Sequence, residues 1–379
     1  MLFSHISDTH LGLVQYGYEE REKDVYDAFS QAIDISIKDH VDFVIFAGDI
    51  FHVPNPSGNA IMHMANALKL LKKNKIDSFF ILGEHDISRI RATPVPYVYH
   101  NLEFSRYIGQ GKPIIYKNVL IVGFDKIRKN EMRFFEDKFK EVDDIAKNHN
   151  GHRILVMHQG ITEINKFAGE LNSNELPKNF SYYAMGHLHD NFLKKFKHLG
   201  GPLAYPGSIE LTTSEGIKDT KKGFFEVDIS SSEAKPEWIE LDIRPQLSVQ
   251  TTYEGLEKKM DEISKKILQY QKKPILEFRI QGNNIETDLV QAQILRLSSH
   301  TLRCSWKIYQ KEEKGSRVLL EKPAIIDDEL FKLAVSTLKS EKLASFAVKE
   351  LIPLLSMNEI EQASQLVFEN FEQFKKEKK

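Results

Sequence analysis

Short apolar runs alternate with amphipathic segments along the first part of the chain. Residues 2–7 and 41–47 are apolar runs of strand length, and polar residues with glycine follow each run. The segment between them carries small and apolar residues at the spacing of a helix with one buried face, at Val25, Ala28, Phe29, Ala32, Ile33, Ser36 and Ile37. A strand, a helix and a strand in this length predict a β-α-β unit, which brings both strand ends to one edge of a parallel sheet.

A second helix is predicted after the turn at residues 54–57, with Ser57 as its N-cap. Its apolar residues form a stripe that is wider than packing on one sheet requires: Ile61, Met62, Met64, Ala65, Ala67, Leu68, Leu70 and Leu71. One interpretation is a deeply buried helix. The other is that the outer edge, with Met62 and His63, packs against a second subunit.

The remaining apolar runs of this region extend the sheet structure. A hairpin is predicted over residues 114–124 with its turn at Lys117-Asn118, and an amphipathic helix over residues 131–149. Further strands are predicted at residues 77–82, 154–157, 182–185, 203–205 and 224–229. We therefore expect an α/β fold in which two sheets pack as a sandwich flanked by helices.

The pattern changes near Arg244, and this change predicts three domains: residues 1–243, 244–322 and 323–379. The middle one is predicted to be a small α+β capping domain, with a helix over residues 256–270 and strands at 275–280 and 305–310. The last is helical, with apolar stripes at Leu330, Leu333, Ala334 and Leu338, then at Leu343, Phe346, Ala347 and Leu351, and in a final helix that a capping box opens at Ser356. These helices either pack on the capping domain or bind a helix of a partner protein.

Composition narrows the protein class. The 379 residues are 41% hydrophobic and 28% charged, which is typical of a globular protein of more than one domain. A net charge of -2 gives no overall attraction to nucleic acid, but a local basic groove is enough for binding. Cys304 is the only cysteine, which excludes an intrachain disulfide and a thiolate zinc cluster. We expect no signal peptide and no membrane span, and hence a cytoplasmic protein.

Five short stretches of acidic residues and histidines follow predicted strands, at residues 7–12, 48–52, 83–86, 158–160 and 186–189. Side chains at strand ends, on turns opened by glycine, can converge on one edge of a sheet. The candidate set is Asp8, His10, Asp49, His158, His187 and His189, which is too large for one metal ion. The other histidines, His5, His40, His100, His149, His152, His198 and His300, are expected to be structural.

Two metal ions that share a bridging carboxylate would use the whole set. Asp49 is the natural bridge, because it ends the second strand of the β-α-β unit. Mixed nitrogen and oxygen ligands suit Mn²⁺, Fe²⁺ or Zn²⁺ better than Mg²⁺. Such a pair of ions activates water for displacement at phosphorus. Asp86 next to His85 could hold a proton donor or stabilise the transition state, and a ligand or structural role for His85 stays open.

The five stretches resemble the motifs of the calcineurin-like metallophosphoesterases, in the family's order, across residues 8–189. Within that superfamily, residues 7–12, 48–52, 158–160 and 205–208 resemble the family of DNA double-strand-break repair nucleases that includes Mre-eleven and SbcD. The layout of a nuclease domain, a capping domain and C-terminal helices is also similar. The resemblance implies that the protein binds DNA ends.

The resemblance implies roles for individual residues. One Mn²⁺ would bind Asp8, His10, Asp49 and His189, and a second would bind Asp49, His158, His187 and the residue at position 84. His85 would be the catalytic histidine, and His52 would help to position DNA for exonuclease cutting. The resemblance also implies a homodimer through helices like the one at residues 57–73. An ABC-type ATPase (Rad-fifty or SbcC) would bind through helices like those at residues 327–374.

Position 84 departs from the family pattern, because Glu84 stands where asparagine is usual. The protein is then either an active nuclease with an altered metal preference or a weakened nuclease retained as a scaffold for the ATPase. We expect a Mn²⁺-dependent enzyme, acting as an exonuclease on double strands and an endonuclease on single strands, associated with the nucleoid. The alternatives are a small-molecule phosphodiesterase and a non-catalytic DNA-end tether. Tyr16, Arg21 and the lysines of the capping domain are candidates for contacting DNA.

Overall fold

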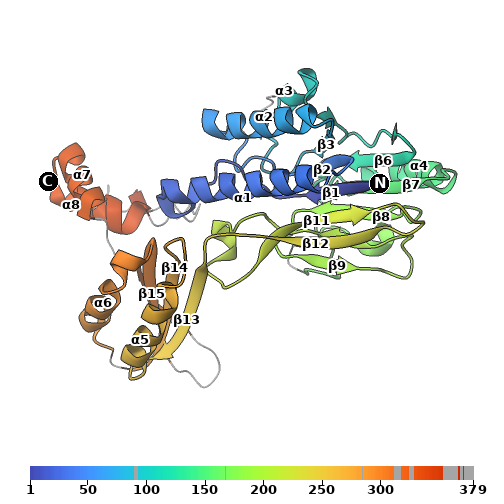
Figure 1. The fold of residues 1–379 in the computed structure, drawn as a ribbon. Helices are drawn as coiled ribbons and strands as arrows, with labels where there is room; N and C mark the ends of the chain where they lie inside the picture. Colours follow the sequence, from blue (N-terminus) through green and yellow to red (C-terminus); the bar gives the residue numbers. More distant parts are fainter. Residues whose placement is uncertain are drawn as a thin grey trace. The chain divides into compact units, whose positions relative to one another are not determined.

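The fold was examined in a computed structural model, which describes residues 1–88, 93–166, 168–283, 285–310, 317–323, 328–352, 366–367 and 370. The chain divides into two compact units. The first contains residues 1–212 and 221–243, and the second contains residues 213–220 and 244–379. All the candidate site residues lie in the first unit, which is the α/β sandwich (Figure 1).

One sheet of the sandwich contains the β-α-β unit predicted from the sequence. Strand β1 (Leu2–Ile6), helix α1 (Glu19–Lys38) and strand β2 (Phe43–Ala47) are followed by helix α2 (Gly58–Lys73) and strand β3 (Asp77–Ile81). The strand order is β12-β11-β1-β2-β3-β4, where β4 is Arg106–Tyr107, β11 is Lys222–Asp228 and β12 is Lys235–Leu241. Strands β1, β2 and β3 run parallel, so the loops that follow them leave the same edge of the sheet.

The other sheet begins with the predicted hairpin, β5 (Ile114–Tyr116) and β6 (Val119–Phe124), which turns at Lys117-Asn118. Strands β7 (His152–His158), β8 (Tyr182–Gly186) and β10 (Leu203–Tyr205) continue it in parallel from β6, with β9 (Phe192–Lys194) antiparallel at the end. The order is β5-β6-β7-β8-β10-β9. Helix α4 (Glu136–Lys147) connects β6 to β7 and is shorter than the sequence pattern predicts.

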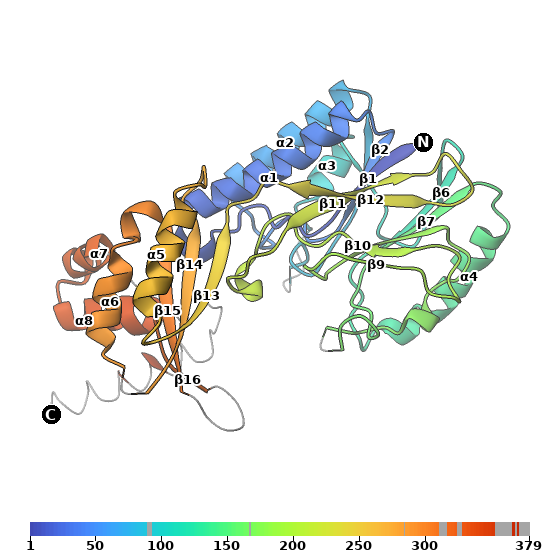
Figure 2. The ribbon, with the colours of Figure 1, turned by 60° about the horizontal axis from the view of Figure 1, so that its bottom comes forward.

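Three hydrophobic cores hold these layers together. The core between the two sheets contains Phe3, Phe43 and Ile154, all fully buried. A second core lies between the first sheet and helices α1 and α2, and a third lies between the second sheet and α4. Figure 2 shows α1 and α2 on one side of the sandwich and α4 on the other. The predicted two-sheet sandwich flanked by helices is confirmed.

Helix α2 is only partly buried. Its N-cap is Ser57, as predicted, and the Ser57 side chain accepts a hydrogen bond from the backbone N–H of Ala60. Met64 and Leu68 are buried in the core, whereas Met62 is 57% exposed. The ring of His63 stacks on Tyr26 of the same chain at a centroid distance of 3.8 Å, and its packing against a second subunit stays a prediction. Val98 and Leu102, on and next to the short helix α3 (Tyr97–Asn101), are also exposed, and the Tyr99 hydroxyl of α3 donates a hydrogen bond to the Ile61 carbonyl of α2.

The second unit contains a four-stranded sheet in the order β13-β14-β15-β16. The sheet is built from two β-α-β connections. The first consists of β13 (Gln246–Thr252), α5 (Leu256–Ile267) and β14 (Ile275–Gln281), and the second continues from β14 through α6 (Thr287–Leu295) to β15 (Arg303–Gln310). Strand β16 (Arg317–Pro323) pairs antiparallel with β15. Buried residues of α5 and α6, such as Met260 and Ile294, pack with Phe278 and Trp306 of the sheet. Neither β13 nor α6 was predicted, although Leu247 and Val249 of β13 alternate with polar residues.

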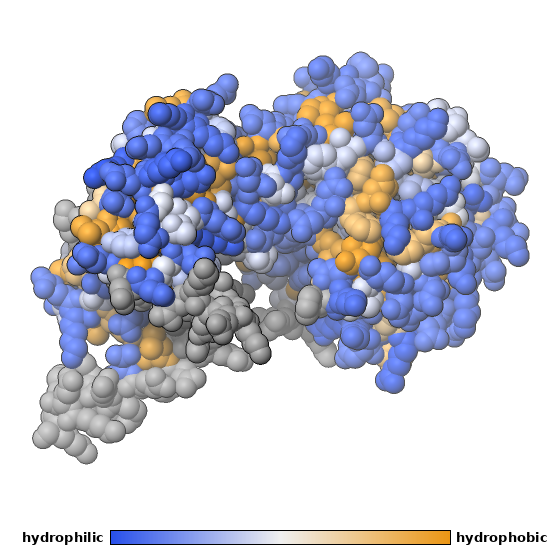
Figure 3. Space-filling model, turned by 90° about the horizontal axis from the view of Figure 1, so that it is seen from below, coloured by the Kyte–Doolittle hydropathy of each residue, from blue (hydrophilic) through white to orange (hydrophobic). Residues whose placement is uncertain are grey.

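The C-terminal part of the second unit is helical where it is described. Helix α7 (Asp328–Leu338) precedes α8 (Glu341–Phe346), and a π-helical turn (Ala347–Leu351) follows. The predicted final helix falls almost entirely outside the described residues. The division of the chain into domains at 243 and 322 stays a prediction. Within the part of the chain that the structure describes, no helix is long and apolar enough to span a membrane. Figure 3 shows a mainly hydrophilic face on which hydrophobic residues form small separate areas.

Candidate two-metal site

The candidate residues meet where the strands of both sheets end. The loops after β1 and β2 run side by side, held by hydrogen bonds from the Asp8 N–H to the Gly48 carbonyl (3.1 Å) and from the His10 N–H to the Asp49 carbonyl (3.0 Å). The other sheet contributes His158 at the end of β7 and the loop after β8. That loop is joined to the first one by the His187 N–H, which donates to both carboxylate oxygens of Asp8 at 3.1 Å. The structure thus brings together the side chains of Asp8 and His189, which are 181 residues apart in sequence.

Four of these residues adopt a backbone conformation that side chains other than glycine rarely take. The φ angles are 52° at Asp8, 42° at His10, 50° at Asp49 and 97° at His187. Each such residue costs on the order of 1–3 kcal/mol of backbone strain. Strain of this kind is retained only where the surrounding structure enforces it. Its concentration in four neighbouring polar residues is typical of a functional site.

Gly48 makes room for a histidine. It has φ of 87°, and a Cβ at this position would overlap the imidazole of His158, so only glycine fits. The close approach lets Nδ1 of His158 hydrogen-bond the Ala47 carbonyl at 2.8 Å. Because a carbonyl oxygen accepts, Nδ1 carries the proton. Nε2 of His158 is then directed toward the carboxylates.

One group of nitrogen and oxygen atoms surrounds a position between the first loop and the loop after β8. Nε2 of His10 and Nε2 of His189 face each other at 3.1 Å, and Oδ1 of Asp8 lies 3.9 Å from Nε2 of His189. Nδ1 of His189 lies 3.1 Å from the Thr212 hydroxyl, which fixes the ring. Potential ligand atoms of Asp8, His10 and His189 all lie within 4.8 Å of one another.

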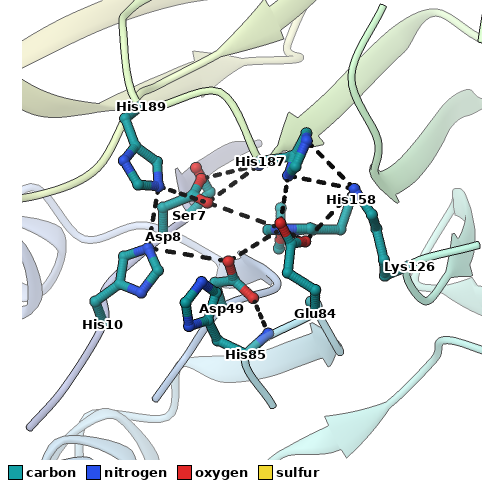
Figure 4. A network of polar contacts seen from close by, with 12 residues as sticks. Ser7, Asp8, His10, Asp49, Glu84, His85, Lys126, His158, His187 and His189 are labelled. Atoms are coloured by element: carbon teal, nitrogen blue, oxygen red, sulfur yellow. Dashed lines mark hydrogen bonds and ion pairs between the residues drawn. The ribbon is translucent and has the colours of Figure 1, made fainter. Parts of the chain in front are cut away.

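A second group of atoms lies next to the first, with Asp49 between them (Figure 4). Oδ2 of Asp49 is 3.9 Å from Nε2 of His10 in the first group and 3.3 Å from Nε2 of His158 in the second. Glu84 completes the second group, because its two oxygens lie 3.0 Å from Nε2 of His158 and 2.8 Å from Nδ1 of His187. Asp49 therefore lies between the two groups, and its role as a bridging ligand stays a prediction.

Burial shapes the electrostatics of the site in the metal-free protein. Burial lowers the pKa of His158, but the adjacent carboxylates of Asp49 and Glu84 outweigh burial and hold the pKa well above its usual value. The pKa of Glu84 is lowered, because His158 and His187 outweigh the effect of burial on this carboxyl. Burial holds the pKa of His10 well below its usual value, so this imidazole is neutral. The site thus contains a protonated histidine among carboxylates.

The donor set fits divalent cations. Three carboxylates (Asp8, Asp49 and Glu84) converge with four imidazoles (His10, His158, His187 and His189), and the inner members are almost fully buried. Carboxylates that close together require positive charge between them. Two imidazole Nε2 atoms that lie 3.1 Å apart suit coordination of one cation as adjacent ligands. His187, His189 and Glu84 are partly exposed, so the site opens to solvent on one side.

Comparison with known proteins gives the family. Residues 1–191 match the model of the calcineurin-like phosphoesterases. The chain is 31% identical to the DNA double-strand break repair protein Mre11 of Saccharolobus solfataricus, over 81% of this chain and 82% of the relative. It is 33% identical to Mre11 of Thermoplasma acidophilum over 74% and 76%, and 34% identical to Mre11 of Methanocaldococcus jannaschii over 73% and 75%. The chain belongs to the Mre11 family. The predicted family is confirmed.

Two further histidines line the site of this Mre11 family member. Nδ1 of His85 lies 2.7 Å from the carbonyl of His52, and the two rings stack at a centroid distance of 5.4 Å. The His85 N–H also donates to Oδ1 of Asp49 at 2.9 Å. Nδ1 of His85 therefore carries the proton toward the carbonyl, and Nε2 is left for a reacting group. Burial and the neighbouring His85 lower the pKa of His52 to about 4.

The predicted pairing of Asp86 with His85 needs correction. The carboxylate of Asp86 accepts hydrogen bonds from the backbone N–H groups of Ile50 (3.1 Å), Phe51 (3.0 Å) and Gly83 (3.0 Å). It is 1% exposed, and burial together with the charge of Asp49 raises its pKa to about 7. The His52 carbonyl, rather than Asp86, orients the imidazole of His85. Adjacent residues in a tight turn point in different directions, and Asp86 points into the loops and joins them.

Lys126 was missed in the sequence, although it follows a strand just as the motif residues do. It comes two residues after β6, and its ammonium lies 3.5 Å from Glu84 and 3.3 Å from both ring nitrogens of His187. Thr212 was also missed, because nothing in the sequence links it to His189. Strand-end position alone would have indicated Lys126, but a basic residue does not fit the ligand pattern of a cation site.

Arg21 was predicted as a candidate for contacting DNA, and the structure contradicts this. Its guanidinium is fully buried and forms ion pairs with Asp24 (2.7 Å) and Glu210 (3.1 Å). It also donates to the side chain of Gln15 at 2.8 Å. Arg21 therefore joins helix α1 to the loop after β10, two residues before Thr212. Its role is to stabilise the fold.

Proposed function

We propose that this protein is a Mn²⁺-dependent DNA nuclease that acts in double-strand-break repair. The observation that carries the proposal is the pair of adjacent donor groups on either side of Asp49, which suits two divalent cations. One cation would bind Asp8, His10, Asp49 and His189, and the other would bind Asp49, Glu84, His158 and His187. A bound pair would supply an activated water and positive charge for displacement at phosphorus.

The residues beside the two groups have roles that the geometry supports. Nδ1 of His85 is directed to the His52 carbonyl, so Nε2 is the ring nitrogen that would donate a proton to the leaving oxygen, from the imidazolium form. His52 stacks on His85 and helps to place the DNA strand. Glu84, where asparagine was expected, adds a hard oxygen ligand that favours Mn²⁺ over softer ions. Mg²⁺ suits the set less well, because four donors are imidazoles.

The DNA path lies on the open side of the site in this proposal. The segment that follows Lys126 is exposed and basic, with Arg128, Lys129 and Arg133. Arg133 stacks on the exposed Phe134, with its guanidinium carbon 4.8 Å from the ring centroid. Basic residues with an exposed aromatic ring suit phosphates and unstacked bases. The nuclease would cut double strands as a 3′-5′ exonuclease and single strands as an endonuclease.

The partners proposed for the chain follow from its exposed apolar residues and its family. The edge of α2 and α3 around Met62, Val98 and Leu102 would form a homodimer. The C-terminal helices, where Leu338 and Leu343 are 43% and 41% exposed, would bind an ABC-type ATPase of the Rad-fifty kind. The complex would act on DNA ends in the cytoplasm, at the nucleoid.

A cleavage assay on linear double-stranded and circular single-stranded DNA tests the proposal, with Mn²⁺, Mg²⁺ or chelator and with the His85→Gln variant alongside. We expect cutting that requires Mn²⁺ and that falls at least about a hundredfold in the variant, which is the usual contribution of a positioned proton donor. Calorimetric Mn²⁺ binding by the variant must stay intact. A metal-loaded wild type that cuts only a small diester would indicate the small-molecule phosphodiesterase. No cutting of either substrate would indicate a scaffold for the ATPase.

A further inference from the structure

The ammonium of Lys126 lies inside the candidate metal site. Its side chain is only 9% exposed, and Nζ lies 2.7 Å from Oε2 of Glu170 and 3.5 Å from Oε2 of Glu84. It also lies 3.3 Å from both ring nitrogens of His187, so it rests against the face of that imidazole (Figure 4). A buried lysine next to cation ligands needs an explanation, because it repels the cations that the ligands would bind.

Glu84 gives that explanation. Oε2 of Glu84 is shared between Nε2 of His158 at 3.0 Å and the Lys126 ammonium at 3.5 Å. Oε1 contacts His187 at 2.8 Å. Lys126 therefore contacts the oxygen that approaches His158, and it also lies against the imidazole of His187, which contacts Oε1.

Glu170 holds Lys126 from the other side. Besides the 2.7 Å ion pair, Oε2 of Glu170 accepts a hydrogen bond from the Gly160 N–H at 3.3 Å. Gly160 follows His158 by two residues, so Glu170 ties Lys126 to the end of β7.

We propose that Lys126 is a positioning residue that fixes Glu84 between His158 and His187 and offsets part of its charge. The inference rests on the proposed two-metal function and deepens it. Because the same ammonium also pairs with Glu170 at 2.7 Å, it offsets only part of the negative charge that a carboxylate at position 84 adds. A phosphodiester that approaches from the open side then meets less repulsion than an unpaired Glu84 would cause. Lys126 thus determines whether a glutamate is tolerated at this position.

Melting temperatures in chelator test the pairing without any requirement for activity. The variants are Lys126→Met, Glu84→Gln and both together, with Lys126→Arg as the conservative change. Lys117→Met is a matched control, because Lys117 forms a 2.7 Å ion pair with Asp42 but is 54% exposed and remote from the site. We expect Lys126→Met to lower the melting temperature by about 5 °C, since it removes the cation that Glu170 and Glu84 share. In the Glu84→Gln background the loss should be smaller, because only the ion pair with Glu170 is then left to lose. Lys117→Met should change the melting temperature by no more than about 1 °C.

Calorimetric titration with Mn²⁺ gives the second readout. Lys126→Met should bind Mn²⁺ several-fold more tightly, because a like charge is removed while Glu84 is retained. Lys126→Arg should restore the wild-type melting temperature. Equal melting losses from Lys126→Met in the wild-type and Glu84→Gln backgrounds, or weaker Mn²⁺ binding by Lys126→Met, would overturn the inference. A smaller melting loss in the Glu84→Gln background without DNA cutting would leave the inference standing and refute the nuclease. DNA cutting with equal melting losses in both backgrounds would support the nuclease and overturn the inference.

Discussion

The carboxylate of Asp86 accepts a hydrogen bond from the backbone N–H of Phe51 at 3.0 Å. Together with the bonds from Ile50 and Gly83, this contact joins the loop that carries Asp49 to the loop that carries Glu84. The geometry of the second cation position therefore depends on a residue that reaches neither cation position itself. Asp86 supports the loops that carry the ligands, and its contribution can be tested separately from theirs.

Replacement of Asp86 by asparagine should loosen both loops. An asparagine offers one oxygen to three N–H groups and turns an N–H toward one of them, so we expect a loss of about 2 kcal/mol in the free energy of unfolding. Urea denaturation in chelator measures this loss. Mn²⁺ affinity, followed by calorimetry, should fall as well, because Asp49 loses its fixed position. An unchanged Mn²⁺ affinity would show that the loops hold their shape without Asp86.

Arg21 and the exposed basic segment after Lys126 should respond in opposite ways to substitution. Arg21→Met leaves Asp24 and Glu210 buried without their cation, so we expect it to destabilise the protein by about 3 kcal/mol.

The double variant Arg128→Ala with Lys129→Ala should leave the free energy of unfolding within about 0.5 kcal/mol of the wild type. It should reduce the slope of log Kd for DNA against log salt by about 2. Fluorescence anisotropy at several salt concentrations distinguishes the two classes, and a salt slope that survives the double variant would place the DNA elsewhere.

Met62→Glu should prevent self-association. Met62 is 57% exposed on an apolar edge, and a carboxylate there has to be desolvated in a dimer interface. We expect the wild type to be a dimer at micromolar concentration and the variant to be a monomer by light scattering. Thermal stability of the monomer should stay close to that of the wild type, since Met62 makes no core contact. A wild-type monomer at the same concentration would contradict the dimer outright.

Buried His5 should make the protein acid-sensitive. Burial lowers the pKa of His5 to about 3, and its Nδ1 is 3.0 Å from the Tyr182 hydroxyl. A folded-state pKa below the unfolded value of about 6.5 means that the unfolded chain takes up the proton first. The contribution of His5 is therefore present above pH 6.5 and is lost as the pH falls toward 3. Denaturation in chelator at about pH 7 and about pH 4 should show a smaller acid loss for His5→Phe than for the wild type. Equal acid losses in the two proteins would assign the sensitivity to other groups.

The sequence by itself determined the sandwich and most of the candidate site. The apolar runs at Leu2–Ile6 and Phe43–Ala47 form strands in which the apolar side chains are buried between the layers. The amphipathic helix that connects them makes the two strands parallel. Asp8 and Asp49 must then leave the same sheet edge. The same pattern, a polar residue directly after an apolar strand, predicted His158 and His187 on the other sheet. These placements depend on periodicity and strand order, which a linear pattern contains.

Only the tertiary structure decided where the remaining side chains point. Asp86 adjoins His85 in sequence but binds backbone N–H groups of another loop, because a turn separates neighbouring side chains. Arg21 has the charge expected of a DNA contact, but its guanidinium is buried and pairs with Glu210, which lies 189 residues away in the sequence. Lys126 acquires its role only because two sheets bring Glu84 and Glu170 to it. Such contacts are set by the packing of distant segments, which no local pattern records.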